Sequence, residues 1–504
     1  MSRLSTSTPV AVIGAGIMGA GIAQLAAQAG HPVRLFDAQE GAAQRGLDRI
    51  AKDLQGAVQR GKLDAAQRDA VISRLSVAPD VQALAGCGLA IEAIVEWLEP
   101  KQALFRQLEA VLGAEAVLAT NTSSISITAI AQGLQHPQRV IGWHFFNPAP
   151  RMKLVEVIRG IETDEALAAE MHALSKAWGK TSVDAPNAPG FIVNRVARPY
   201  YAEGLRLLGE RIAPLQAIDR LLREAGGFSL GPFELIDLIG VEVNLSVTES
   251  VWAATQYDNR YAPNLIQQEL ARAGHFGRKS GRGFYDYREG APKPEVSFVT
   301  PQGEAPMLRA AADAGLLAPL VDRLRGAGLN VQPDEALPRE TLAFDNLQVK
   351  LSDGRTATER AVSEGPMLLL DLARDFATTP LLGAAASAGA EGQLPRLAAL
   401  LQPAGIDLLA LQDVAGLCVM RIVCGLANEA ADVMAWSGTR AADIDTAMVL
   451  GTAYPIGPLA WADAIGASRV VQVLEHLHRH YGETRYRRSP RLLRAHFAKE
   501  RLHD

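Results

Sequence analysis

Short apolar runs alternate with longer helical stretches over the first part of the chain. Residues 9–13 form a β-rich run, residues 20–29 a helical stretch, and residues 32–36 a second strand-like run. Alternation of this kind through residues 1–187 predicts the strands and helices of a doubly wound α/β sheet. Residues 190–287 lack such strand-like runs, and we expect them to form an all-α region.

The helical region occurs twice. Residues 190–240 align without gaps on residues 416–466, always 226 positions later. The shared positions are glycines, prolines and residues of buried type, so we interpret the duplicated feature as a fold. Asn194 aligns with Met420, which has no useful hydrogen-bonding group, and the second copy is therefore expected to be structural. The recurring residues are Val193, Arg195, Glu203, Ile218, Asp219, Gly231, Pro232, Asp237 and Gly240.

Segments rich in proline and glycine at residues 184–190 and 288–294 mark two boundaries. The region between the helical copies has strand-like runs at residues 343–351 and 366–372 but no glycine-rich fingerprint. We therefore predict four domains. They are an NAD-binding Rossmann domain (1–187), a first helical domain (188–290), a reduced, cofactor-free Rossmann-like domain (291–408) and a second helical domain (409–504).

A glycine fingerprint lies between the first strand and the first helix. Gly14 permits a tight turn, Gly16 lets the backbone approach a pyrophosphate, and Gly19 lets helix and strand pack closely. Asp37 ends the second strand, where it would accept hydrogen bonds from ribose hydroxyls and repel a 2′-phosphate. This pattern predicts NAD rather than NADP as cofactor. A βαβ unit without a ligand stays possible, and the glycines do not distinguish NAD from FAD.

A candidate general base, His144, lies in the apolar segment of residues 140–146. A lone histidine among apolar residues is more often a packed core residue. Glu156, however, lies in the next apolar segment, and a charge inside a strand needs a partner. A histidine held by a carboxylate is a general base with a fixed tautomer and a stabilised cation.

The base and the fingerprint together resemble the 3-hydroxyacyl-CoA dehydrogenase family. Four further segments match its motifs in order, so the resemblance covers residues 9–287. These segments are residues 91–101, 120–125, 189–195 and 277–285. The resemblance implies NAD-dependent oxidation of a (3S)-3-hydroxyacyl-CoA to the 3-oxoacyl-CoA, with His144 and Glu156 as the catalytic pair.

The resemblance also implies roles for five other residues. Ser123 and Asn194 would hold the C3 oxygen of the substrate, while Glu96, Lys101 and Lys279 would belong to the cofactor site, which Ser123 would share.

Each of these residues also has a simpler interpretation. Ser123 could cap a helix beginning near Ile125. Asn194 could be a solvated polar position, and Glu96 and Lys279 could be ordinary surface charges.

Residues 291–408 resemble the reduced domain of the long bacterial form of this family, which oxidises 3-hydroxyadipyl-CoA in phenylacetate breakdown. We therefore expect that substrate, with 3-hydroxybutyryl-CoA or general β-oxidation as the alternative. Two further alternatives are enzymes. A related 3-hydroxyacid dehydrogenase would use a lysine, not a histidine such as His144, as its general acid/base. A multifunctional fatty-acid oxidation subunit would carry a hydratase domain ahead of Gly14. An alternative of a different class is a non-catalytic structural or NAD-binding relative.

Composition is that of an ordinary globular protein, with 48% hydrophobic and 21% charged residues in 504. A net charge of −5 supplies no basic field for nucleic acid, and no apolar run of membrane-spanning length occurs. Three cysteines without metal-ligand spacing (Cys87, Cys418 and Cys424) predict a reducing compartment and no metal site. We expect a cytoplasmic enzyme that could form a homo-oligomer. This would be a dimer or a trimer of pseudo-dimers, in which the two helical copies of one chain make each pseudo-dimer.

Overall fold

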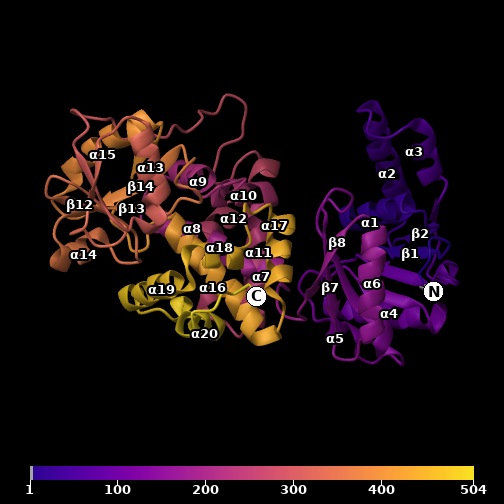
Figure 1. Cartoon of the computed structure of the whole chain (residues 1–504). Helices are drawn as coiled ribbons and strands as arrows, with labels where there is room; N and C mark the ends of the chain where they lie inside the picture. Colours follow the sequence, from indigo (N-terminus) through magenta and orange to yellow (C-terminus); the bar gives the residue numbers. More distant parts are fainter. Residues whose placement is uncertain (1–3, 504) are drawn as a thin grey trace. The chain divides into compact units, whose positions relative to one another are not determined.

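A computed structural model describes residues 4–503 of the chain, which forms two compact units. The first unit comprises residues 1–195 with 442–452, and the second comprises residues 196–441 with 453–504. Each unit contains one β-sheet with helices around it (Figure 1). This division is coarser than the predicted four domains, whose boundaries stay a prediction.

The sheet of the first unit has eight strands in the order β3-β2-β1-β4-β5-β6-β7-β8. Neighbouring strands are parallel except for β6 and β7, which are antiparallel. The order from β3 to β6 is that of a Rossmann dinucleotide-binding fold. The strands are β1 (Val10–Ile13), β2 (Val33–Phe36), β3 (Leu75–Val77), β4 (Leu89–Glu92), β5 (Val117–Thr120), β6 (Val140–Phe145), β7 (Leu154–Arg159) and β8 (Thr181–Ala185).

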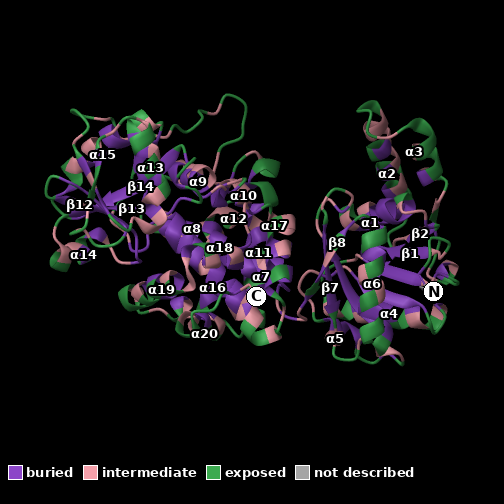
Figure 2. Cartoon of the chain, in the orientation of Figure 1, coloured by how far each residue is buried: buried purple, intermediate pink, exposed green. Residues whose placement is uncertain are grey.

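The central strands of this sheet are buried along their whole length, as Figure 2 shows. Helices cover both faces of a parallel sheet, so its strands are continuous apolar runs rather than alternating ones. Helices α2 and α3 follow β2 as a hairpin and expose much of their surface (Figure 2). The helices are α1 (Ile17–Gln28), α2 (Ala42–Gln59), α3 (Ala65–Ile72), α4 (Leu98–Val111), α5 (Ile127–Ala131), α6 (Glu165–Ala177) and α7 (Val193–Val196).

The second unit contains a seven-stranded mixed sheet in the order β10-β9-β11-β12-β13-β14-β15. Its strands are β9 (Leu308–Ala311), β10 (Val331–Asp334), β11 (Thr341–Phe344), β12 (Leu347–Leu351), β13 (Met367–Leu370), β14 (Leu381–Ala386) and β15 (Asp407–Ala410). The expected single strand over residues 343–351 is instead the antiparallel hairpin β11–β12. The turn at Asp345, where φ is +49°, interrupts a run whose apolar pattern is otherwise continuous.

Most of the remaining helices belong to the two repeated segments. The first copy contains α8 (Arg198–Gly209), α9 (Leu215–Glu224), α10 (Pro232–Ile239), α11 (Val241–Ala254) and α12 (Leu265–Arg272). Helices α13 (Ala318–Gly326), α14 (Ala357–Glu364) and α15 (Leu394–Leu401) accompany the second sheet. The second copy contains α16 (Val419–Ser437), α17 (Ala441–Thr452), α18 (Pro458–Ile465), α19 (Ala467–Tyr481) and α20 (Pro490–Ala498).

The two helical copies pack against one another through reciprocal contacts between α8 and α16 and the segments that follow them. Glu203 of the first copy accepts a hydrogen bond from the Tyr486 hydroxyl at 2.9 Å. Glu429, the repeat equivalent of Glu203, accepts one from the Tyr261 hydroxyl at 2.5 Å. Tyr261 and Tyr486 each follow an arginine in their own copy. This reciprocity is that of an isologous dimer interface, formed here within one chain.

No helix among residues 4–503 is both long and apolar enough to cross a membrane.

Candidate active site

The glycine loop between β1 and α1 has no space for side chains at two of its three fingerprint positions. Gly14 has φ +99°, and a Cβ there would lie 2.4 Å from the Ala93 carbonyl oxygen. A Cβ at Gly19 would lie 1.7 Å from the Gly14 oxygen. At Gly16, by contrast, a Cβ would meet no atom within 4 Å, so this backbone faces open space. The loop therefore has the tight turn, the close packing and the accessible backbone that a pyrophosphate requires.

Gly16 is the N-cap residue of helix α1, and no side chain caps the first N–H groups of this helix. Uncapped N–H groups at a helix N-terminus favour an anion. Asp37, at the end of β2, accepts a hydrogen bond from the Ala15 N–H at 2.7 Å and so ties the glycine loop to the neighbouring strand. A groove of about 820 Å³ opens beside Asp37 along the ends of β2 and β3. These features fit the phosphates and adenosine ribose of a dinucleotide.

His144 and Glu156 are directly opposite one another on the antiparallel strands β6 and β7. The His144 Nδ1 and a Glu156 oxygen, Oε2, are 2.7 Å apart. Both residues are buried, and the His144 ring packs on Phe146 and Phe191. With Nδ1–H donated to Glu156, the lone pair of the imidazole is on Nε2. The expected pairing is present as geometry, and it is the arrangement by which a carboxylate can orient a histidine base.

The second oxygen of Glu156 binds the start of the helical region. Its Oε1 accepts hydrogen bonds from the Ile192 and Val193 N–H groups, both at 3.0 Å. Asn194 follows these two residues directly. Glu156 therefore fixes the imidazole of His144 and the backbone beside Asn194 at the same time.

Glu96 and Ser123 belong to a second group of linked residues. The Glu96 Oε1 accepts hydrogen bonds from the Ser123 N–H at 2.8 Å and from the Thr122 hydroxyl at 2.6 Å. The Lys101 ammonium lies 3.1 Å from Glu96 and 2.5 Å from the buried Glu92. Burial alone would raise the pKa of Glu96, but Lys101 and these hydrogen bonds hold it below its usual range. Glu96 is therefore an ionised anchor for the Ser123 loop rather than an ordinary surface carboxylate.

Asn121 joins the two groups of residues. Its Oδ1 accepts a hydrogen bond from the Phe145 N–H at 2.8 Å, next to His144 in β6. The Ser123 loop follows β5, and His144 lies in β6. These two strands are neighbours in the sheet, so the loop begins beside the strand that carries His144.

One interpretation changes in the structure, and the Lys279 contact is left untested. Ser126, not Ser123, caps the helix in this region, because its side chain accepts a hydrogen bond from the Ala129 N–H. The capping interpretation of Ser123 was therefore wrong. Lys279 lies in the second unit, half exposed, where its ammonium pairs with Glu242. A contact between Lys279 and a cofactor stays a prediction.

Two residues of the site, Glu92 and Asn121, were not singled out from the sequence. Glu92 ends the apolar run of β4, which is the same signal that drew attention to Glu156. Asn121 carried no comparable signal, because its role depends on a contact with Phe145, 24 residues away in the chain.

Within residues 4–503, no three or more His, Cys, Asp or Glu side chains are grouped so that they could hold a metal ion. The first sheet carries a histidine paired with a carboxylate and a dinucleotide-type loop. It is suited to removing a proton from an alcohol while a hydride leaves the same carbon.

Models of protein families match most of the chain. The model described as "3-hydroxyacyl-CoA dehydrogenase, NAD binding domain" matches residues 9–188. The model of the C-terminal domain of the same family matches twice, at residues 190–287 and 416–504. A model described as "3-hydroxybutyryl-CoA dehydrogenase reduced Rossmann-fold domain" matches residues 349–414.

Individual proteins are similar over nearly the whole length. The chain is 42% identical over 479 residues to a protein named 3-hydroxyadipyl-CoA dehydrogenase from Escherichia coli K12, covering 95% of both chains. A crystal structure titled 3-hydroxybutyryl-CoA dehydrogenase, also from Escherichia coli K12, superimposes with a TM-score of 0.89 at 40% identity and covers 98% of this chain and 99% of that one. A shorter relative from Bacillus subtilis, named probable 3-hydroxybutyryl-CoA dehydrogenase, is 41% identical and covers 56% of this chain and 97% of its own length.

Proposed function

The chain belongs to the 3-hydroxyacyl-CoA dehydrogenase family, and on that premise we propose that it oxidises the C3 hydroxyl of a (3S)-3-hydroxyacyl-CoA to a ketone. The observation that carries this proposal is the buried His144–Glu156 pair, in the same unit as the glycine loop of a dinucleotide site. NAD, when bound, supplies the acceptor for the hydride that leaves C3.

His144 would take the proton of the C3 hydroxyl on Nε2 as the carbonyl forms. Glu156 would hold the ring in the required tautomer and stabilise the imidazolium. General base catalysis of this type contributes roughly 10²–10⁴-fold to the rate. Ser123 and Asn194 would hold the C3 oxygen and orient the C–H bond for transfer.

The cofactor would be held mainly by the first unit. Gly14, Gly16 and Gly19 would receive the pyrophosphate, and Asp37 the adenosine ribose, which favours NAD over NADP. The fixed charge of Glu96, with Lys101 behind it, would face the nicotinamide ribose region. Lys279 would complete the cofactor site.

We propose 3-hydroxyadipyl-CoA, of phenylacetate breakdown, as the substrate. The chain is similar over 95% of its length to a protein named 3-hydroxyadipyl-CoA dehydrogenase, and this similarity supports the choice. 3-Hydroxybutyryl-CoA remains the second candidate, because a solved structure covering almost all of this chain carries that name. The acyl-CoA class is common to both.

A non-catalytic relative would have lost one of the four catalytic positions, and all four are filled here. Association of several copies into a homo-oligomer, each with its own internal pair of helical domains, is part of the same proposal.

NADH formation, followed by absorbance with purified protein, NAD and 3-hydroxybutyryl-CoA, tests the reaction. Replacement by 3-hydroxyadipyl-CoA then tests the substrate. Absence of NADH with either thioester, under conditions where NAD binding is measurable, would refute the proposed activity.

A further inference from the structure

A closed ring of polar contacts joins the ends of β4 and β5 in the first unit. Glu92, which is 0% exposed, accepts hydrogen bonds from the Lys101 ammonium at 2.5 Å and from the Thr120 hydroxyl at 2.6 Å. The Thr120 oxygen in turn accepts a hydrogen bond from the Thr122 N–H at 3.2 Å. On the other side, Lys101 lies 3.1 Å from Glu96, whose second oxygen accepts from the Thr122 hydroxyl at 2.6 Å. We call these five residues the Glu92 ring.

Lys101 is the enclosed centre of the Glu92 ring. Its side chain is 1% exposed, and its ammonium lies between the buried carboxylate of Glu92 and the carboxylate of Glu96, whose side chain is 37% exposed. Burying charges is costly unless opposite charges and hydrogen bonds compensate them, and here both are supplied. A bound cofactor or substrate cannot reach the ammonium in this arrangement, so Lys101 acts on the site through Glu96.

The loop that carries Ser123 depends on the Glu92 ring for its backbone hydrogen bonds. The Ser123 and Ser124 N–H groups donate to Glu96 at 2.8 and 3.2 Å, and the Ile125 N–H donates to the Thr122 hydroxyl at 3.0 Å. Together with the Thr122 N–H, four successive N–H groups thus donate to side chains of the ring. Backbone groups away from water need such partners. The ring therefore does for this segment what pairing in a strand or helix does elsewhere.

We infer that Glu92 is a positioning residue of the dehydrogenase reaction: it touches neither substrate nor cofactor but, through the Glu92 ring, fixes Ser123 and Glu96. Its two oxygens hold the two arms of the ring, one through Lys101 and one through Thr120. The inference rests on the proposed function, since Ser123 and Glu96 serve the reaction only as contacts of substrate and cofactor. The dependence of the loop on Glu92 does not rest on that function.

Hydrogen exchange of the purified protein, measured by mass spectrometry on peptides that cover residues 122–125, tests the ring directly. In Glu92→Gln the amide keeps one acceptor oxygen but has an NH₂ group in place of the other, so one arm of the ring loses its acceptor. We expect exchange of these amides to rise at least about tenfold, the effect of losing about one hydrogen bond. The double variant Glu92→Gln/Lys101→Met leaves neither charge buried alone. It should show the same rise, and it provides the test if Glu92→Gln does not fold.

A matched control lies on the same helix as Lys101. Glu109 of α4 accepts hydrogen bonds from the Gln135 and His136 N–H groups, both at 2.9 Å, outside the ring. Glu109→Gln should therefore raise exchange near residues 135–136 and leave residues 122–125 unchanged.

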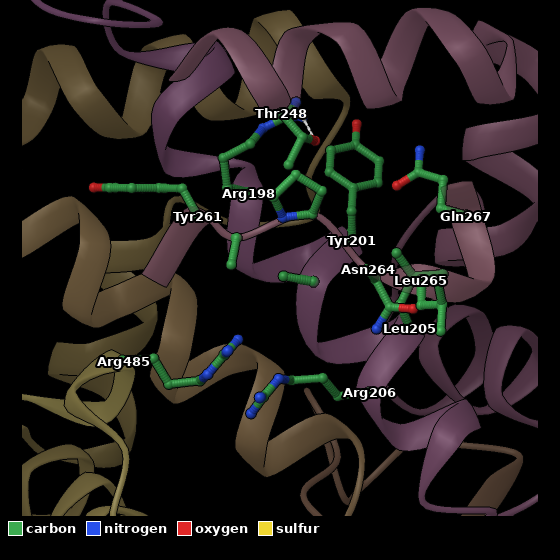
Figure 3. A pocket seen from close by; sticks show the side chains of 13 residues that line it. Arg198, Tyr201, Leu205, Arg206, Thr248, Tyr261, Asn264, Leu265, Gln267 and Arg485 are labelled. Carbon is green, nitrogen blue, oxygen red and sulfur yellow. Dashed lines mark hydrogen bonds between the residues drawn. The ribbon is translucent and has the colours of Figure 1, made fainter. Parts of the chain in front are cut away.

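A second control measures the effect of a general loss of stability. In the second unit, the Thr248 hydroxyl accepts a hydrogen bond from Arg198 at 3.0 Å in the wall of a small pocket (Figure 3). Thr248→Val removes this contact, so it should lower the stability of the protein without changing exchange at residues 122–125.

Steady-state kinetics connect the ring to the reaction. With 3-hydroxybutyryl-CoA and NAD, Glu92→Gln should lower kcat/KM at least about tenfold, because Ser123 would no longer be held at the C3 oxygen. Glu109→Gln should keep the wild-type value.

The pH dependence of cofactor binding separates positioning from stability alone. Glu96 faces the Lys101 ammonium on α4, the Glu92 carboxylate of β4 behind it, and three hydroxyls of the loop after β5. Burial raises the pKa of Glu96, whereas Lys101 and the hydrogen bonds lower it. Loss of Lys101 in the double variant should let this pKa rise, so NADH binding, followed by fluorescence, should weaken at least about threefold from about pH 8 to about pH 5.5. Wild-type and Glu109→Gln proteins should show nearly constant NADH affinity over this range, because Glu96 stays ionised.

Unchanged exchange at residues 122–125 in both Glu92→Gln and the double variant would overturn the inference, as would an equal rise in Glu109→Gln or Thr248→Val. Wild-type kcat/KM in a folded Glu92→Gln protein would also overturn it. Unchanged NADH affinity in Glu96→Gln, or absence of NADH formation with every 3-hydroxyacyl-CoA, would instead refute the proposed function and leave the exchange result for the ring intact.

Discussion

Glu156 and Asp371 are buried carboxylates that cap equivalent positions in the two helical copies. Each accepts hydrogen bonds, through one oxygen, from two consecutive N–H groups, and the two pairs of donors are 226 residues apart. The donors are Ile192 and Val193 at 3.0 Å for Glu156, and Cys418 at 3.0 Å and Val419 at 2.7 Å for Asp371. The second oxygen of Glu156 faces His144, whereas that of Asp371 accepts from the Met420 N–H at 3.0 Å. Capping is therefore common to both halves, and the pairing with histidine belongs to the first half alone.

We predict that Glu156→Gln lowers both stability and kcat, while Asp371→Asn lowers only stability. The amide that replaces the carboxylate keeps one oxygen that can accept hydrogen bonds, but it has an NH₂ group in place of the second oxygen. Each buried N–H group that loses its acceptor in this way lowers the free energy of unfolding by about 1–3 kcal/mol. Chemical denaturation and steady-state kinetics of the two variants provide the comparison. A folded Asp371→Asn protein with kcat reduced tenfold would contradict the separation of roles.

His144→Gln should keep the fold and NAD affinity but lose at least about 10²-fold in kcat, because glutamine cannot accept the proton. Glu156→Gln should retain more activity than this variant, since the imidazole remains. NAD titration and single-turnover rates measure the two effects. Retention of a tenth or more of wild-type kcat by His144→Gln would exclude a general base at this position.

Asp37 should make NAD the preferred acceptor. We expect the double variant Asp37→Ser/Ala38→Arg to shift the ratio of kcat/KM values towards NADP, because it removes the repelling carboxylate and adds a cation. Ala38→Arg alone is the control for the added charge. Equal activity of the wild-type protein with NAD and NADP would be incompatible with a ribose role for Asp37.

Met420 and Asn194 occupy the same repeat position with different expected consequences. Met420 is fully buried, so Met420→Ala should cost about 2–5 kcal/mol of stability and leave kcat of the folded protein nearly unchanged. Asn194→Ala should lose little stability and show a clear drop in kcat/KM. Denaturation curves and kinetics of both variants distinguish these patterns; a tenfold loss of kcat in a stable Met420→Ala protein would place the second copy in the active site.

Asp371 should make stability depend on pH. Burial raises the pKa of the Asp371 carboxyl to about 6, although its hydrogen bonds from backbone N–H groups act to lower that pKa. In the unfolded chain the carboxyl has the usual pKa of an aspartate. The folded state therefore binds more protons than the unfolded state between about pH 4 and 6, and this group favours folding more as the pH falls. The stability of the wild-type protein relative to Asp371→Asn should rise by up to about 3 kcal/mol from pH 7 to pH 4. A flat difference across this range would contradict the raised pKa.

Local patterns were sufficient to predict several parts of the molecule. The glycine loop depends on residues that are neighbours in the sequence. His144 and Glu156 lie opposite one another because their strands follow one another in the chain and pair in the sheet. The hairpin β11–β12 was missed because its turn interrupts an apolar run without a proline or glycine. The hydrogen bonds of Glu203 with Tyr486 and of Glu429 with Tyr261 could not be predicted, because they form only through the packing of two helical copies far apart in the chain.

The covalent link between the helical copies changes what a substitution can do. In a symmetric dimer of identical chains, every change appears on both sides of the interface. Here Glu203 and Glu429 can diverge in their surroundings while the hydroxyl contacts from Tyr486 and Tyr261 are kept. Dilution cannot separate the two copies, since tethering fixes their effective concentration. The second helical copy can therefore lose residues needed for catalysis, as long as it still packs against the first copy.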